Sequence, residues 1–207
     1  MAASPVTPNR RGTRSREVVL DAAARLMARD GFEAATVAAI VKESGIPASS
    51  VYHYFGSKDG VLLAVMERGA ERFFAELPEP RERAGTAEEH LSAMVAGVVH
   101  VLDRHPDFLR LLIVFATQPP DASDGQVREV VNRVRATALE RITGQLALAF
   151  GDEPDDPHVL QLARFTLASI DGAFVAHQSD PKVGLDEVLA PFPQAAGSIR
   201  AGLRKSR

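Results

Sequence analysis

Residues 36–58 read TVAAIVKESGIPASSVYHYFGSK and contain two short segments with an apolar face on either side of a tight turn. Thr36 is a suitable N-cap for a first helix over residues 37–44. Gly45 supplies the positive φ angle that ends this helix, and Pro47 fixes the entry of a second helix over residues 48–54. Two short helices joined in this way predict a helix-turn-helix that reads DNA.

The second helix of this motif combines small polar residues with aromatic residues that have polar tips. A recognition helix lies in a major groove about 12 Å wide, so small residues let its backbone approach the base edges. Serine hydroxyls can contact bases or phosphates, and tyrosine and histidine suit phosphate oxygens and thymine methyl groups. For Tyr52 and Tyr54 the alternative is half-buried packing with solvated hydroxyls. The candidate DNA-contacting residues are Arg11, Arg14, Thr36, Ala48, Ser49, Ser50, Tyr52, His53, Tyr54 and Lys58.

A long helix is predicted to begin directly after the motif, with Ser57 as its N-cap and its end near Glu76. Lys58 lies in the first turn of this helix, where the helix dipole disfavours a cation. A phosphate bound at the helix N-terminus would explain the lysine; a solvated lysine is the alternative.

Residues 1–13 contain two prolines, a glycine and no apolar period, which predicts a flexible basic arm. Such an arm binds phosphates or the minor groove in other proteins, whereas a solvated tail is the alternative. The chain has a net charge of -3, but residues 1–58 hold eight Lys and Arg against five Asp and Glu. Because a phosphate backbone responds to local charge, this N-terminal excess is compatible with DNA binding.

Residues 15–63 resemble the DNA-binding domain of the TetR family of transcriptional regulators. The resemblance is carried by the spacing of glycine, aromatic and lysine residues in Gly31-Phe32, Thr36, Ile40, Gly45-Ile46, Ser50-Val51-Tyr52-His53-Tyr54-Phe55, Ser57-Lys58 and Leu62-Leu63. Three departures concern how the recognition helix is held and what it reads: Val41 replaces an alanine, Pro47 a serine cap, and Ser49 a glycine or proline. The remainder of the chain resembles the family in length and helical rhythm.

Apolar periodicity predicts an all-α fold, with an N-terminal three-helix helix-turn-helix domain and a C-terminal helical domain for ligand binding and dimerisation. The expected division is a flexible arm over 1–13, a DNA-binding domain over 14–60 and an effector-binding and dimerisation domain over 61–207. Beyond the motif, helices are expected over residues 15–30, 87–104, 106–117, 126–149, 157–178 and 185–190, with a last amphipathic helix following.

The segment 157–178 is apolar on two faces, whereas a surface helix needs only one apolar stripe. The second face predicts a partner subunit, most simply a second copy of the chain. The candidate dimer-interface residues are Leu162, Phe165, Ser169, Gly172, Ala173, Ala176 and Ile199.

The family resemblance implies a homodimer that binds a palindromic operator in double-stranded DNA. It also implies that a small apolar or amphipathic effector enters the C-terminal domain, shifts helix 60–76 and releases the DNA. The candidate effector-contacting residues are Met66, Phe73, His100, Phe115, Phe165 and His177. For both histidines a hydrogen-bonded structural role is the favoured alternative. The alternative for the whole chain is an effector-independent DNA-binding dimer whose C-terminal domain is an interaction scaffold.

Other chemistries lack the residues that they require. The chain has no cysteine, which excludes disulfides and thiolate catalysis, and none of its six histidines follows a Glu by three residues, as a helical di-iron site would need. P-loop, Rossmann and nucleophile-elbow motifs are also absent, so we expect no enzyme, metal or cofactor. With no apolar run near ~20 residues and no apolar stretch after the N-terminal arginines, no membrane partner is expected, and the chain is predicted to be cytoplasmic.

Overall fold

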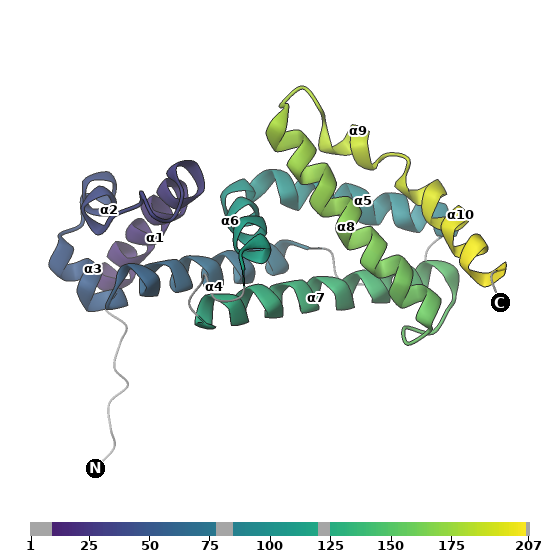
Figure 1. Ribbon diagram of the computed structural model, residues 1–207, viewed down its shortest axis with the longest axis horizontal. Helices are drawn as coiled ribbons and strands as arrows, with labels where there is room; N and C mark the ends of the chain where they lie inside the picture. Colours follow the sequence, from purple (N-terminus) through teal and green to yellow (C-terminus); the bar gives the residue numbers. More distant parts are fainter. Residues whose placement is uncertain (1–9, 78–84, 120–124, 206–207) are drawn as a thin grey trace, which may run out of the picture. The chain divides into compact units, whose positions relative to one another are not determined.

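A computed structural model describes residues 10–77, 85–119 and 125–205, and this part of the chain forms ten α-helices and no strand (Figure 1). The all-α fold class is therefore confirmed. The helices are α1 (Arg10–Asp30), α2 (Val37–Ser44), α3 (Ala48–Phe55), α4 (Lys58–Glu76), α5 (Ala87–Arg104), α6 (Pro106–Thr117), α7 (Gly125–Phe150), α8 (Pro157–Ser179), α9 (Leu185–Leu189) and α10 (Phe192–Lys205).

The chain divides into two compact units. Unit 1 comprises Met1–Glu71 and Asp107–Val131, and unit 2 comprises Arg72–Pro106 and Asn132–Arg207. The predicted division at residues 60 and 61 follows the end of the DNA-binding motif. The units instead follow packing, so the first part of α4 and all of α6 after Pro106 belong with the helix-turn-helix.

The core of unit 1 forms between α1, the helix-turn-helix and the first part of α4. Its fully buried side chains include Leu20, Met27, Ile40, Val51, Val61 and Met66. Helix α1 begins at Arg10, so the prediction that residues 10–13 belong to a flexible arm is wrong. Arginine is a good helix former, and the two prolines of the predicted arm lie upstream, so no proline interrupts the helix at residues 10–13 and the single Gly12 is tolerated. The rest of the predicted arm, residues 1–9, lies outside the described residues.

Arg68 and Gly69 both help to hold α4 within unit 1. Arg68 Nη1 on α4 lies 2.8 Å from Glu17 Oε2 and 2.8 Å from Asp21 Oδ1 on α1. Gly69 lies against the ring of Phe108 on α6, so closely that an added Cβ would be 2.3 Å from Cδ2. The absence of a side chain at residue 69 therefore sets how closely α4 and α6 approach.

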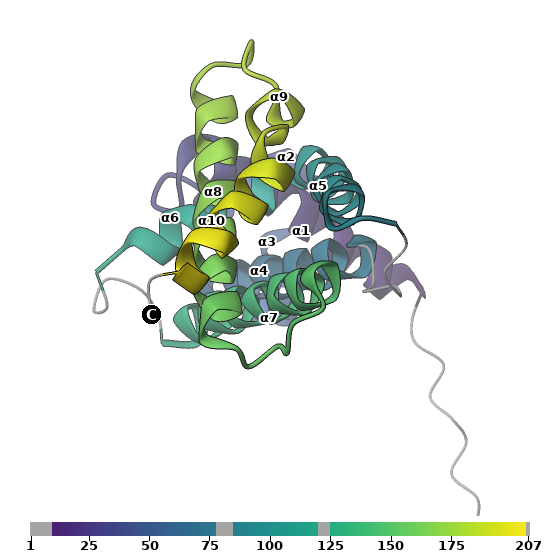
Figure 2. The same cartoon turned by 90° about the vertical axis from the view of Figure 1, so that its right-hand side faces the viewer.

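In unit 2, α10 packs against both α5 and α8, and α9 contacts the same two helices (Figure 2). Helix α5 begins with a capping box in which Thr86 and Glu89 each satisfy a backbone N–H group of the other residue. The core of this unit includes Leu91, Met94, Ile142, Leu146, Val159, Leu162, Ala163, Phe192 and Ala196.

The loop between α7 and α8 is joined to α10 by a buried carboxylate. Asp152, whose side chain is 6% exposed, accepts from Arg200 Nε at 2.6 Å and Nη2 at 2.7 Å, and from Arg204 Nη2 at 2.5 Å. The Arg200 guanidinium holds the pKa of the Asp152 carboxyl below its usual value, against the opposing effect of burial. Asp152 is therefore charged over the physiological range and stabilises the position of α10.

We expect Asp152→Asn to lower the free energy of unfolding at pH 7 by about 2 kcal/mol, because the change weakens a partly buried, multiply hydrogen-bonded ion pair. A lowered folded-state pKa contributes stability above the unfolded pKa of about 3.9, and this contribution is lost as the pH falls through the folded pKa. Urea unfolding should therefore show a difference between wild type and variant at pH 7 that shrinks below about pH 4. A difference that is constant with pH would contradict this assignment.

Among the described helices, only α8 is long and apolar enough, by length and composition alone, to cross a membrane. This corrects the expectation that no apolar run approaches that length. Helix α8 contributes Val159, Leu162 and Ala163 to the core of unit 2, and its Asp171 pairs with Arg135 of α7 at 2.8 Å. A helix that packs inside a bundle needs the same apolar composition as a membrane span, so composition does not distinguish the two.

Candidate nucleic-acid interface

The turn between α2 and α3 has the geometry that its sequence predicts. Thr36 Oγ1 accepts from the backbone N–H of Ala39 at 3.2 Å and caps α2. Gly45 has a φ of 69°, and its N–H donates to Val41 O at 2.9 Å. Ser44 Oγ also accepts a hydrogen bond from the backbone N–H of Ile46 at 3.2 Å. This bond was not predicted, although serine commonly stabilises turns in this way.

Helix α3 exposes one stripe and buries the opposite side. Val51 is 1% exposed and anchors the helix in the core of unit 1. Ala48, Ser49, Tyr52 and His53 are exposed, and their spacing places them on one face. Tyr52 is 53% exposed, so the alternative that it is a half-buried packing residue does not hold.

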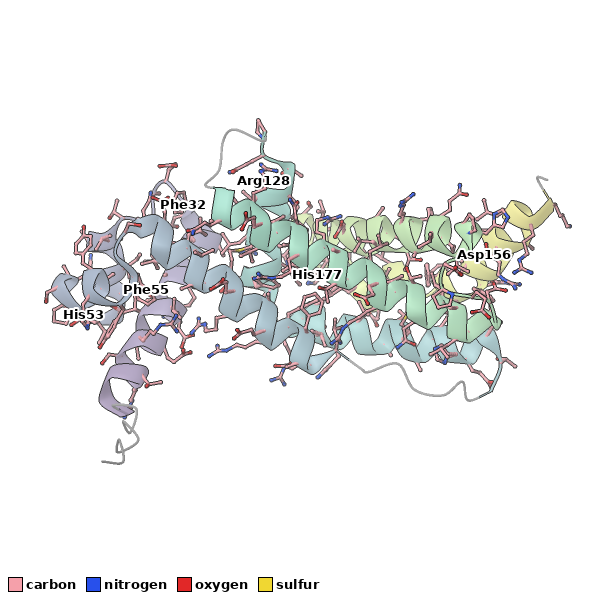
Figure 3. All side chains as sticks on the ribbon, turned by 90° about the horizontal axis from the view of Figure 1, so that it is seen from below. Phe32, His53, Phe55, Arg128, Asp156 and His177 are labelled. Carbon is pink, nitrogen blue, oxygen red and sulfur yellow. The ribbon has the colours of Figure 1, made fainter. Side chains whose placement is uncertain are left out.

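Ser50 and Tyr54 are half-buried and lie to the side of this exposed stripe. The ring of Tyr54 contacts those of His53 and Phe55, with ring centres 5.6 Å and 6.0 Å apart. Figure 3 labels these two neighbours, His53 and Phe55. The packing alternative that the sequence allowed therefore describes the Tyr54 ring. Arg16 of α1 lies over Phe55 at 5.4 Å from the ring centre, a contact that no local pattern predicts.

Lys58 is held by partners inside unit 1. Its Nζ donates to the backbone oxygen of Phe32 at 3.2 Å and lies 4.0 Å from the centre of the Phe32 ring. It is also 3.5 Å from Glu33 Oε2, and the lysine side chain is 25% exposed. The lysine thus binds carbonyl groups just beyond the end of α1, which explains its position without a bound anion. Its contact with a DNA phosphate stays a prediction.

The remaining DNA-contact candidates lie at the ends of two helices. Thr36, at the N-terminus of α2, and Arg14, on the first part of α1, are both exposed. The side chain of Arg11 lies outside the described residues.

Arg68 is a positioning residue that was not predicted from the sequence. It joins α1 to α4 through ion pairs with residues 47 and 51 positions earlier, so local spacing could not have identified it.

The effector-contact candidates are not brought together within either unit. Met66 and Phe115 are buried in unit 1, and Phe73 is buried in unit 2. His100 and Phe165 are exposed on their own unit, so an interior role for these two side chains there is wrong. His100 is exposed because α5 turns Val101 and Leu102 inward, which leaves residue 100 on the outer side.

The sixth effector candidate, His177, is half-buried in unit 2. Its Nδ1 lies 2.7 Å from the backbone oxygen of Val183, just beyond the end of α8. This bond supports the structural alternative for His177.

The dimer candidates separate into core and surface residues. Leu162 and Ala173 are 1% and 2% exposed within a single subunit, so their assignment to a partner-facing surface is wrong; α8 buries both side chains in its own subunit. Phe165 and Gly172 are exposed, while Ser169, Ala176 and Ile199 are half-buried. The exposed apolar stripe of α8 runs through Phe165, Ala168, Gly172 and Val175.

A capped helix, a glycine turn and a second helix with an exposed stripe of serine, tyrosine and histidine define a DNA-binding regulator of the helix-turn-helix class. Residues 19–65 match the family model described as bacterial regulatory proteins, tetR family. Residues 19–65 therefore form a DNA-binding domain of the TetR family of transcriptional regulators. Since this family is made of regulators, the expectation that the chain is not an enzyme is confirmed.

The similarity to known regulators extends beyond the matched segment. The chain is 25% identical over 184 residues to the transcriptional regulator BetI of Brucella suis, covering 89% of this chain and 85% of that protein. Its fold is similar to that of a transcriptional regulator from Saccharomonospora viridis in complex with choline, with a TM-score of 0.66, 20% identity and coverage of 90% and 95% of the two chains. It is also similar to FadR of Bacillus subtilis in complex with stearoyl-CoA, with a TM-score of 0.59, 20% identity and coverage of 89% and 95%.

Proposed function

We propose that the chain is a homodimeric transcriptional repressor that binds a palindromic operator in double-stranded DNA. The observation that carries the proposal is the exposed stripe of Ala48, Ser49, Tyr52 and His53 on α3. This stripe offers small residues for close approach and polar tips for bases and phosphates. Each subunit would place one α3 in a major groove, with the two half-sites about one helical turn apart.

Dimerisation through α8 is supported by its exposed apolar stripe. Phe165 and Val175 are each 47% exposed, and Ala168 and Gly172 lie between them on the same face. The small residues would let two copies of α8 approach closely, and the large ones would bury apolar area. A two-fold dimer pairs identical surfaces, so one such stripe per subunit is sufficient.

Release by an effector is supported by the regulators of similar fold that were solved with choline and with stearoyl-CoA. An effector must favour the non-binding state by about 1–3 kcal/mol to change DNA affinity about 5- to 150-fold. The second candidate, an effector-independent dimer, is favoured by one observation in unit 2. The cavity between Met94, Val98, Thr166 and Phe192 has a volume of only about 10 Å³. A more open groove of about 840 Å³ beside Leu139, Thr143 and Leu160 of the same unit is the space that an effector could occupy instead. We infer a cytoplasmic location, because a regulator of this kind must reach the chromosome.

Selection of bound DNA from a random pool, with and without candidate effectors, tests the proposal. We expect an inverted repeat to be enriched, because a two-fold dimer reads two equivalent half-sites. Phe165→Glu should halve the mass measured by light scattering and weaken binding to the full repeat by about 100-fold, since a single subunit retains only one half-site. Enrichment of a single half-site by wild type, or an unchanged mass for the variant, would reject the dimeric operator complex.

The effector part of the proposal has its own outcome. An effector should lower the amount of enriched DNA that is retained, without changing the selected sequence. Val188→Glu is the matched control for Phe165→Glu, because Val188 is also an exposed apolar residue of unit 2 but belongs to α9 and not to the α8 stripe. This control should leave both mass and affinity unchanged.

A further inference from the structure

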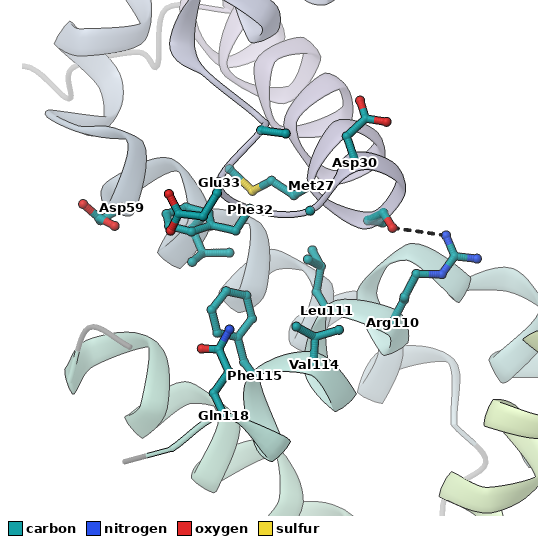
Figure 4. Close-up of a pocket in the computed structure, with 14 residues that line it drawn as sticks. Met27, Asp30, Phe32, Glu33, Asp59, Arg110, Leu111, Val114, Phe115 and Gln118 are labelled. Atoms are coloured by element: carbon teal, nitrogen blue, oxygen red, sulfur yellow. Dashed lines mark hydrogen bonds between the residues drawn. The ribbon is translucent and has the colours of Figure 1, made fainter. Parts of the chain in front are cut away.

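Unit 1 contains a cavity of about 520 Å³ beside the helix-turn-helix (Figure 4). Residues at the end of α1 and in the following turn form one side, the first turns of α4 form a second side, and α6 forms a third. Its volume falls within the range of about 300–1,000 Å³ that is typical of small-molecule sites. One wall includes the effector candidate Phe115, but α1 and the turn that follows it belong to the predicted DNA-binding domain, so the cavity differs from the expected site inside the C-terminal domain.

The walls of this cavity are mainly apolar. Met27 of α1, Leu62 of α4 and Leu111 of α6 contribute aliphatic or thioether surface. The rings of Phe32 and Phe115 meet edge to face with their centres 6.1 Å apart, so two aromatic side chains meet at the same wall. A ligand with an apolar body would replace water against these walls, which favours binding.

The charged residues around the cavity are mostly carboxylates. Asp30, Glu33 and Asp59 all line it, and Figure 4 shows them around the edge of the apolar residues. Asp30 is paired with Arg29 at 2.7 Å, and Glu33 lies 3.5 Å from Lys58. Asp59 forms no ion pair with any residue that the structure describes.

Arg110 is the one basic residue among those that line the cavity, and it already has partners. Its Nη1 donates to the backbone oxygen of Ala28 at 3.4 Å and lies 3.9 Å from Asp107 Oδ1. Because Arg29, Lys58 and Arg110 are each close to a carboxylate of Asp30, Glu33 or Asp107, Asp59 is the lining charge that is left to attract a cation into the cavity.

Gln118 adds an unsatisfied acceptor to the wall. Its side-chain Oε1 is buried and has no hydrogen-bond partner among the described residues. The backbone around it is fixed, because Arg128 Nη2 donates to the carbonyl oxygens of Gln118 and Pro119 at 3.1 Å and 2.8 Å. A carbonyl oxygen accepts hydrogen bonds only, so a partner for Gln118 must carry an N–H or O–H group.

We propose that this cavity binds a small organic cation of the primary or secondary amine class. The apolar body lies against Leu111, Val114 and Phe115, and the ammonium group lies toward Asp59, with an N–H available to Gln118. A bound amine would touch both the turn after α1 and the first turn of α4, the two segments that Lys58 joins. A ligand in this cavity would therefore contact the DNA-binding domain directly.

Titration calorimetry on the full-length protein without DNA tests the site, with three probes that share a phenylbutyl body. We expect 4-phenylbutylamine, protonated at pH 7, to bind at least about tenfold more tightly than 4-phenylbutanol, and 4-phenylbutyrate to bind more weakly than either. Equal affinities for the three probes, or no binding by the amine at about 10 mM, would overturn the proposal.

Two variants locate the bound amine. Val114→Trp should abolish binding, because Val114 is 47% exposed and a larger side chain there fills the cavity without entering the core. Asp59→Asn should weaken binding of the amine by about tenfold and leave binding of the alcohol unchanged. Asp103 is an exposed aspartate of α5, and Asp103→Asn should change neither affinity. Amine binding that survives both cavity variants would place the ligand elsewhere. Since DNA is absent, this result is independent of whether the proposed operator binding is correct.

Discussion

Ser49→Glu is expected to weaken binding to the selected operator by about 100-fold or more, which corresponds to about 2.7 kcal/mol. Ser49 is exposed in the first turn of α3, on the stripe that is proposed to enter the major groove. A carboxylate there would approach the DNA phosphates, and such like-charge contacts cost several kcal/mol. Fluorescence anisotropy with labelled operator at a fixed salt concentration measures the change.

Loss of folding would not explain this result. A glutamate in the first turn of a helix interacts favourably with the helix dipole, so Ser49→Glu should keep or slightly raise the thermal midpoint. Ser92→Glu is the matched control, because Ser92 is also exposed on a helix but lies on α5 in unit 2. An operator affinity of Ser49→Glu within about threefold of the control would remove α3 from the DNA interface.

Gly69→Ala is expected to lower the free energy of unfolding by about 2 kcal/mol. The new Cβ would lie 2.3 Å from Cδ2 and 2.8 Å from Cγ of Phe108, whose ring is only 6% exposed and has little room to move. Relief of this overlap must separate α4 from α6 or force Phe108 from its rotamer. The loss should appear even though alanine favours a helix over glycine by about 1 kcal/mol.

Two further variants isolate the cause of this loss. Gly144→Ala should stabilise the protein by up to about 1 kcal/mol, because nothing lies within 4 Å of the added Cβ on α7. Phe108→Leu combined with Gly69→Ala should recover part of the loss, giving a favourable coupling energy in a double-mutant cycle. Additive effects in chemical denaturation would mean that residues 69 and 108 do not interact.

The sequence predicted several helix boundaries correctly because their signals act within one turn. Thr36 accepts from a backbone group three residues ahead, and Gly45 adopts a conformation that other residues avoid. Pro106 begins α6, as predicted for a residue that needs no amide partner at a helix start. The start of α1 at Arg10 was missed, because the apolar period on which that prediction relied begins only at Val18.

The exposed stripe of the recognition helix was predicted in part. Once Val51 is turned inward, the helical period places Ala48, Ser49 and Tyr52 outside, as the structure confirms. The same period does not settle residues at the edge of the stripe, and the candidate Tyr54 is half-buried against His53 and Phe55.

The sequence by itself determined the all-α fold, the helix-turn-helix and the residue types on its reading surface, because each depends on groups within a few residues of one another. Only the tertiary structure decided the partners of Lys58 and Arg68, the exposure of His100, and which residues of α8 face the core. Lys58 binds a carbonyl group 26 residues earlier in the chain, and Arg68 binds a carboxylate 51 residues earlier. Such pairs form when packed helices bring distant segments together, so no local pattern records them.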